Sequence, residues 1–159
     1  MKKIVINAQY GGFGLSHEAV MRYAELKGVK LYPFIDKMLR KVFEDVYHET
    51  PTIEDNRVSC ISYALVPPEA YERLLEGDER NTNTADRFKK SNAFFFSENN
   101  IERDDPYLIQ TVEELGDRAN GKCASLRIVK IPNDIKWVIE EYNGSEYIAE
   151  KHRTWYVDE

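Results

Sequence analysis

The sequence predicts a single α+β domain over residues 1–159, with a mixed sheet, about four helices and a C-terminal antiparallel β-hairpin. Three observations predict it. A chain of 159 residues with 42% hydrophobic residues suits one domain with its own core. Apolar residues recur at helical spacing mainly in the first half of the chain, and the C-terminal segment alternates around Asn143-Gly144. Helices and antiparallel strands in different parts of a chain are typical of the α+β class.

The N-terminal third predicts two strands and two helices. Residues 3–9 are rich in β-branched residues on both faces, which indicates a buried strand. Ser16 is a suitable N-cap for a helix that ends at Gly28. Residues 29–35 predict a short extended segment, in which Pro33 favours either an edge strand or a bend in the chain. An amphipathic helix over 35–46 follows.

The middle of the chain is less regular. We expect a strand over 57–65, a short helix opened by Pro67-Pro68, and a mobile loop over 76–90, which is polar and aperiodic. The apolar segment 93–97 predicts either a short strand or an irregular segment that packs into the core. Asp105-Pro106 predicts a capped helix that ends near Gly116 or Gly121, and residues 123–131 predict another strand.

Asn143-Gly144 between two alternating runs predicts a two-residue hairpin turn. The turn sets Tyr142 opposite Ser145 and Ile139 opposite Ile148. Glu150 and His152 then fall on the more apolar face beside Trp137 and Ile139. We expect them to form a half-buried pair, which is either structural or part of a site.

Composition excludes some classes of function. The net charge of −6 disfavours nonspecific binding to nucleic acid, because phosphate contacts need a basic face. Basic residues crowd the first quarter of the chain, so the alternatives are a local basic pocket or ordinary solvated helix faces. No apolar run approaches the roughly 20 residues of a membrane span, and no signal-peptide pattern is present. We expect a cytoplasmic protein that does not bind membranes.

The two cysteines and three histidines do not suggest a metal or cofactor. Cys60 and Cys123 lie far apart in apolar contexts, so we expect reduced, buried thiols. The histidines are scattered, and no catalytic triad or metal motif is recognisable. We therefore expect no cofactor and favour binding over catalysis.

The glycine-rich segment "GGFGLS" has two interpretations. It follows a strand and opens a helix, where backbone N–H groups and the helix N-terminus bind anions. It matches neither GxxxxGK[ST] nor GxGxxG, and a plain turn before an N-cap also explains it. Near the C-terminus, "KHRTW" pairs a guanidinium with an indole, which suits a phosphate and a base. The alternative is the end of a surface strand.

Three segments resemble a family of small proteins, largely of unknown function, that tailed bacteriophages and prophages encode. They are "KIVINAQYGGFGLSHEAVMRYAELKG", "ERDDPYLIQTVEELGDRANGKCASLRIVKIP" and "IKWVIEEYNGSEYIAEKHRTW". Residues 29–100 match less clearly, and residues 50–100 are interpreted as a variable insertion. The resemblance implies a setting in an infected bacterial cell, where such proteins often counteract host defence.

We therefore hypothesise a counter-defence protein that sequesters a small phosphorylated ligand, such as a nucleotide signal, as a homo-oligomer. The alternatives are an inhibitor that binds a host protein, a nucleotide-processing hydrolase, and a phage structural accessory. The candidate ligand-binding residues are Tyr10, Gly11, Gly12, Phe13, Gly14, Ser16, His17, Arg103, His152, Arg153 and Trp155.

Overall fold

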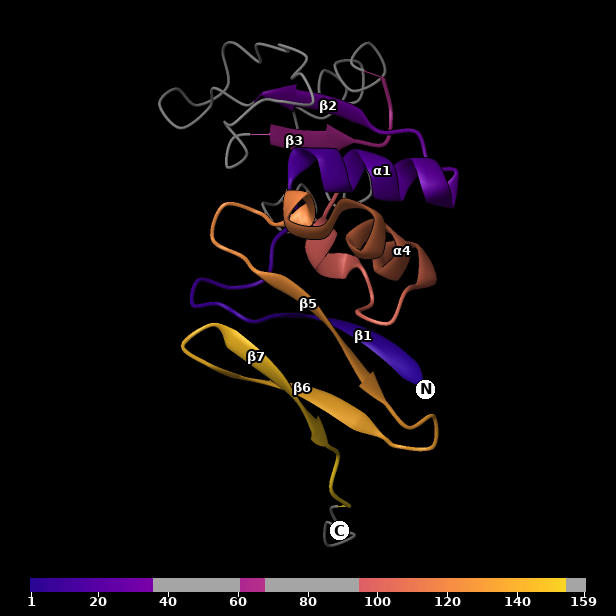
Figure 1. The fold of residues 1–159 in the computed structure, drawn as a ribbon. Coiled ribbons are helices and arrows are strands. Elements are labelled where there is room, and N and C mark those ends of the chain that lie inside the picture. Colours follow the sequence, from indigo (N-terminus) through magenta and orange to yellow (C-terminus); the bar gives the residue numbers. More distant parts are fainter. Residues whose placement is uncertain (36–60, 68–94, 154–159) are drawn as a thin grey trace, which may run out of the picture.

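The computed structural model describes residues 1–35, 61–67 and 95–153 (Figure 1). This part of the chain combines helices with antiparallel strands, so the predicted α+β class is confirmed. It contains two α-helices and two short 3₁₀ helices, where about four helices were expected. The expected helices over 35–46 and after Pro67-Pro68 fall outside the described residues, apart from their first positions, as does the expected loop over 76–90.

The strands β1 (Lys2–Asn7) and β5 (Leu126–Ile131) pair antiparallel, with Ile4 opposite Val129. The last four residues of β1 are buried, which confirms the prediction of a strand covered on both faces. The strand expected over 123–131 was predicted to begin at Cys123, but β5 begins three residues later, at Leu126. Cys123 lies in the preceding loop and is exposed, so the expectation of a buried thiol there was wrong.

A second sheet has the order β2 (Tyr32–Ile35), β3 (Ile61–Ala64) and β4 (Phe95–Phe96). Pro33 lies in β2, the edge strand, as its missing N–H requires. In the described residues every strand pairing is antiparallel and the strands form three separate sheets. The expectation of one mixed sheet was therefore wrong for this part of the chain.

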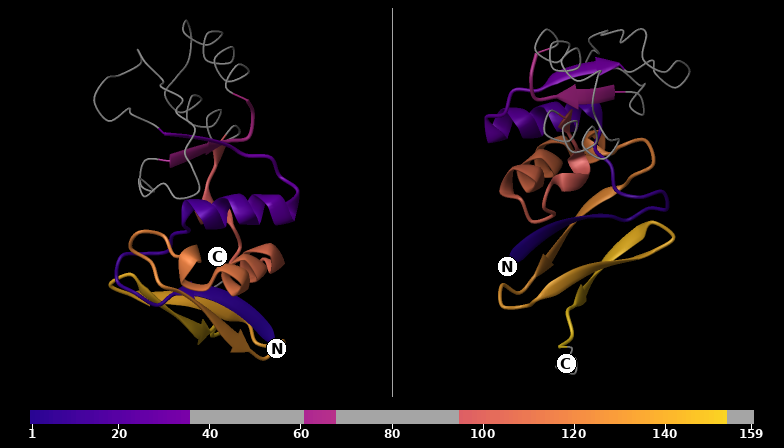
Figure 2. Two further views of the ribbon diagram at one scale, coloured as in Figure 1. Left: turned by 45° about the horizontal axis from the view of Figure 1, so that its top comes forward. Right: turned by 180° about the vertical axis from the view of Figure 1, so that it is seen from behind.

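Helices lie between these two sheets. Figures 1 and 2 show α1 (His17–Lys27) beside β2 and β3, and α4 (Pro106–Leu115) on the side of β1 and β5. Both predicted N-caps are confirmed. Ser16 accepts a hydrogen bond from the N–H of Ala19, and Asp105 accepts from Tyr107 and Leu108.

Two 3₁₀ helices complete this layer, η2 (Glu98–Asn100) and η3 (Gly116–Ala119). α4 ends at Leu115 because Gly116 adopts a positive φ of 56°. The 3₁₀ helix η3 follows it directly. One of the two predicted stop positions for α4 is thereby confirmed.

The predicted hairpin is present as β6 (Trp137–Tyr142) and β7 (Ser145–Glu150), in the predicted register. Asn143 and Gly144 both have positive φ, as a type I′ turn requires. Trp137, Ile139 and Ile148 are half-buried on the inner face. The hairpin lies beside β1 and β5 without continuing their ladder (Figure 1).

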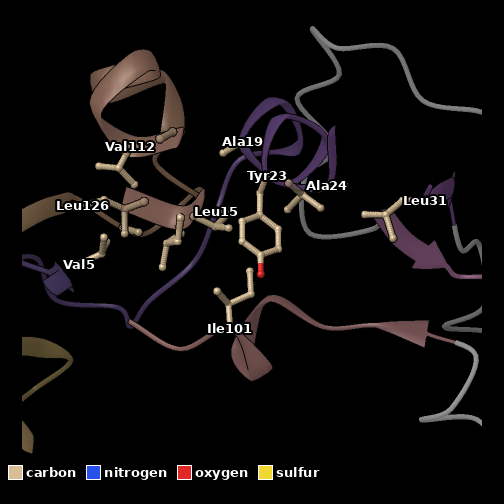
Figure 3. Packing of buried hydrophobic residues seen from close by; sticks show 13 residues of the cluster. Val5, Leu15, Ala19, Tyr23, Ala24, Leu31, Ile101, Val112 and Leu126 are labelled. Atoms are coloured by element: carbon tan, nitrogen blue, oxygen red, sulfur yellow. The ribbon is translucent and has the colours of Figure 1, made fainter. Parts of the chain in front are cut away.

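The core fills the space between the β1–β5 pair and the helices. Figure 3 shows Tyr23 of α1 directed toward Ile101, with Leu15 beside it and Val5 and Leu126 contributed by the sheet. Leu108 of α4 is fully buried. Burial of this apolar surface is the main term that holds the helices against the sheet.

Candidate functional site

Two other backbone segments, the hairpin turn and the loop before β5, pack directly against the glycine-rich loop between β1 and α1. A Cβ on Gly11 would lie 2.8 Å from the carbonyl oxygen of Cys123, and one on Gly144 would lie 2.7 Å from the nitrogen of Gly11. A Cβ on Gly121 would lie 2.8 Å from the carbonyl carbon of Gly14. The hairpin turn and the loop before β5 therefore approach this loop too closely for any side chain.

Backbone N–H groups next to the helix already have partners. The N–H of Leu15 donates to Oε2 of Glu98 at 3.0 Å, and the N–H of Ser16 donates to the carbonyl of Ala119 at 2.9 Å. The Ser16 hydroxyl donates to the carbonyl of Arg118 at 2.6 Å. The anion before the N-terminus of α1 is thus a carboxylate of the chain itself, which was not predicted.

Arg103, a predicted ligand-binding residue, is instead held in an internal ion pair. Its guanidinium donates to both oxygens of Glu146, at 2.8 and 2.9 Å, and stacks on the Phe13 ring with 3.5 Å to the ring centre. Both charged side chains are mostly buried, with exposed fractions of 19% and 8%. This pair joins the hairpin to the loop before α4.

Asn7 completes the junction from the end of β1. Its own N–H donates to Glu146 at 2.7 Å, and its side-chain amide donates to the carbonyls of Gln9 and Gly144. Its side-chain oxygen accepts from the N–H of Ser125 at 2.8 Å. Asn7 is fully buried. We call Asn7, Phe13, Arg103 and Glu146 the hairpin anchor, because Glu146 accepts hydrogen bonds from Asn7 and Arg103, Asn7 bonds the turn, and Arg103 stacks on Phe13.

A cavity of about 240 Å³ lies where β3 and β4 meet Leu15, in the loop before α1. Tyr63 and Phe96 contribute aromatic rings to its wall, with centroids 6.3 Å apart and planes at 89°. We call it the aromatic cavity. Its lining residues are Leu15, Ile61, Ser62, Tyr63, Phe95, Phe96, Ser97, Glu98 and Asn99.

Two titratable side chains, Glu98 and Tyr63, line this cavity, and His17 contacts Tyr63. Burial raises the pKa of Glu98, although the hydrogen bond from Leu15 lowers it in part. Burial, and the charge of Glu98, raise the pKa of Tyr63. Nδ1 of His17 lies 2.8 Å from the Tyr63 hydroxyl, and the His17 side chain is buried against the Tyr63 ring.

The structure does not bring all the predicted site residues together. Phe13 and Arg103 meet in the hairpin anchor, whereas His17 contacts Tyr63 of the cavity wall. Tyr10 is 66% exposed. Gly12 has open space where a Cβ would stand.

The C-terminal candidates lie at the far end of the hairpin from the glycine loop. The turn touches Gly11, and the six residues of β7 carry the chain about 20 Å away from it. His152 and Arg153 are exposed there, and Trp155 lies outside the described residues. Glu150 is exposed as well, so the expected half-buried pair with His152 was wrong: β7 ends at Glu150, and His152 lies beyond the paired strand.

Sequence reasoning missed Asn7, Tyr63, Glu98 and Glu146. A signal existed for Glu146, because the alternation that buries Ile148 puts it on the same face. Asn7 also ends a run of buried apolar residues. Tyr63 and Glu98 gave no local signal, since their partners His17 and Leu15 are 46 and 83 residues away.

Among residues 1–35, 61–67 and 95–153, no group of histidine, cysteine and carboxylate side chains could hold a metal ion. No helix in these ranges is long and apolar enough to cross a membrane. Comparison with protein-family models, curated proteins and solved structures finds no match to the chain.

Proposed function

We propose that this protein binds a small ligand of the nucleotide class and that the aromatic cavity receives its base. The observation that carries the proposal is a cavity of about 240 Å³ that combines the rings of Tyr63 and Phe96 with the carboxylate of Glu98. Ligand pockets usually measure about 300–1,000 Å³. The smaller volume suits one planar ring system, with the rest of the ligand outside.

The lining matches a base in both of its properties. A base offers flat π faces, and stacking on an aromatic side chain is worth about 1–3 kcal/mol per base. It also offers polar edges, which Glu98, Ser62 and Ser97 could engage. An aliphatic ligand would leave these polar groups unmatched.

The proposed biological role follows from the resemblance to phage and prophage proteins. A protein that sequesters a nucleotide signal in the host cytoplasm would counteract a defence system, and it would need tight binding without conversion of the ligand. Homo-oligomerisation is part of the same proposal. The glycine loop would contribute through Leu15, where it reaches the cavity.

Thermal unfolding in the presence of mononucleotides tests the proposal, with mass spectrometry of the recovered ligand. A ligand at 100 times its Kd should stabilise the fold by about 2.7 kcal/mol. Phe96→Ala should abolish the shift, whereas Tyr107→Ala, which removes an exposed ring on α4, should retain it. Recovery of an intact ligand supports sequestration. A converted ligand would indicate an enzyme, and no shift with any nucleotide would reject the proposal.

A second candidate is an inhibitor that binds a host protein through the outer face of the hairpin. Val138, Tyr142 and Tyr147 are 37%, 71% and 48% exposed on this face. Exposed tyrosines are enriched at protein interfaces. Capture of a stoichiometric host protein that is lost in Tyr142→Ser/Tyr147→Ser but retained in Phe96→Ala would favour this function over nucleotide binding.

A further inference from the structure

Glu98 gives the aromatic cavity a directional polar group. Its Oε2 accepts the N–H of Leu15 at 3.0 Å, and both residues line the cavity. No donor from the described residues reaches Oε1, which lies 3.7 Å from where a Cβ on Gly14 would stand. Each carboxylate oxygen has two lone pairs, so the group can accept further hydrogen bonds on both oxygens.

The four common bases present different edges to such an acceptor. Guanine presents a ring N–H beside an exocyclic amino group, which is a pair of adjacent donors at the spacing of a carboxylate. Adenine and cytosine present an amino group beside a ring nitrogen acceptor, and that acceptor would face a carboxylate lone pair. Uracil presents a single N–H between two carbonyl oxygens.

We infer that the aromatic cavity selects a guanine base, with the ring N–H and the amino group of guanine donating to the two oxygens of Glu98. The inference rests on the proposed nucleotide binding and adds the base to it. The perpendicular rings of Tyr63 and Phe96 allow the base to stack on one ring and meet the edge of the other.

The preference for guanine over other bases should be measurable on the wild-type chain. Inosine monophosphate retains the ring N–H of guanosine monophosphate and lacks the amino group. One hydrogen bond to a charged acceptor is then lost, so its Kd should be about tenfold to a hundredfold higher. Adenosine monophosphate, which would set a ring acceptor against the carboxylate, should bind more weakly still.

The test is isothermal titration of the full chain with these three mononucleotides, repeated on Glu98→Gln and on Glu102→Gln, an exposed control. Glu98→Gln should lower affinity for guanosine monophosphate and remove most of its advantage over adenosine monophosphate. Glu102→Gln should behave as the wild type. The melting temperature of each variant reports whether it is folded.

The outcomes separate the inference from the function on which it rests. Nucleotide binding without preference among the three bases, or a guanine preference that survives Glu98→Gln, would overturn the inference and leave nucleotide binding in place. If none of the three binds to the wild-type chain and other nucleotides also fail, both are overturned.

Discussion

Two carboxylates at the start of neighbouring elements, Glu98 and Asp105, have pKa values that shift in opposite directions. Burial raises the pKa of Glu98 because a single backbone N–H only partly replaces water. Burial also acts to raise the pKa of Asp105. There, hydrogen bonds from Tyr107, Tyr23, Lys27 and Leu108 outweigh it and lower the pKa.

Asp105→Ala should reduce the free energy of unfolding by about 1 kcal/mol at neutral pH, because α4 loses its N-cap. The folded pKa of Asp105 is depressed, so its ionic contribution is present above the unfolded value of about 3.9 and is lost as pH falls through the folded value. Urea unfolding at pH 7 and pH 3 should therefore show a smaller difference from wild type at pH 3. An equal difference at both pH values would contradict this account.

Glu98→Gln should make the protein more stable than wild type at pH 7. The folded pKa of Glu98 is raised, so the stability it contributes is present below about 4.3 and is lost as pH rises through the folded value. The gain from glutamine should therefore disappear as pH falls toward 4. Melting temperatures across this range measure it, with Glu102→Gln as the exposed control. A variant less stable than wild type at pH 7 would show that the carboxylate is needed for folding.

The β6–β7 hairpin is the element whose position depends most on polar side chains. A two-stranded hairpin is at best marginally stable alone. Here Glu146, on its inner face, receives hydrogen bonds from Arg103 and from the backbone of Asn7. Gly144 at its turn bonds the Asn7 side chain and packs on Gly11. These contacts hold the hairpin against β1.

Glu146→Gln should reduce the free energy of unfolding by about 3 kcal/mol, because Arg103 is left mostly buried without its counter-charge. Backbone amides of Trp137–Tyr142 and Ser145–Glu150 should exchange with solvent faster, while those of α4 change less.

Tyr147→Phe is the matched control, since it removes only an exposed hydrogen bond from the same strand to Glu140. It should change stability and hairpin exchange little. Equal acceleration of exchange in the hairpin and in α4 by Glu146→Gln would mean that the anchor does not act locally.

At the scale of the whole described part, helices separate two sheets that do not pair with each other (Figure 2). The β1–β5 pair and both α-helices share one apolar cluster, to which Val5, Tyr23 and Leu108 belong. The aromatic cavity lies where β3 and β4 meet the loop before α1. Leu15 belongs both to its lining and to the core cluster, and Tyr63 and Phe96 pack against that cluster, so the candidate site adjoins the core.

Leu108→Ala should reduce the free energy of unfolding by about 2–5 kcal/mol, because Leu108 is fully buried in the shared cluster and leaves a void. Chemical denaturation measures the loss. Tyr107→Ala, one position away and 40% exposed, should cost much less. Similar losses for the two variants would contradict the assigned core.

The sequence predicted the features that depend on neighbours in the chain. Ser16 and Asp105 cap helices with donors two or three residues away, and Asn143-Gly144 adopts the positive φ values that its turn needs. The hairpin register follows from that turn, so it was predictable as well. Helices over 35–46 and after Pro67-Pro68 stay predictions, as does the role of Trp155.

The tertiary structure alone decided which side chains meet. Arg103 and Glu146 are 43 residues apart, and Glu98 reaches Leu15 across 83. Such pairs depend on how complete elements pack. In each pair, the sequence around one residue does not indicate which distant residue it will contact. By itself the sequence determined caps, turns, strands and the α+β class, because these follow from local backbone preferences and apolar periodicity. Packing decided that the glycines form a backbone junction and that the cavity forms around Tyr63, Phe96 and Glu98.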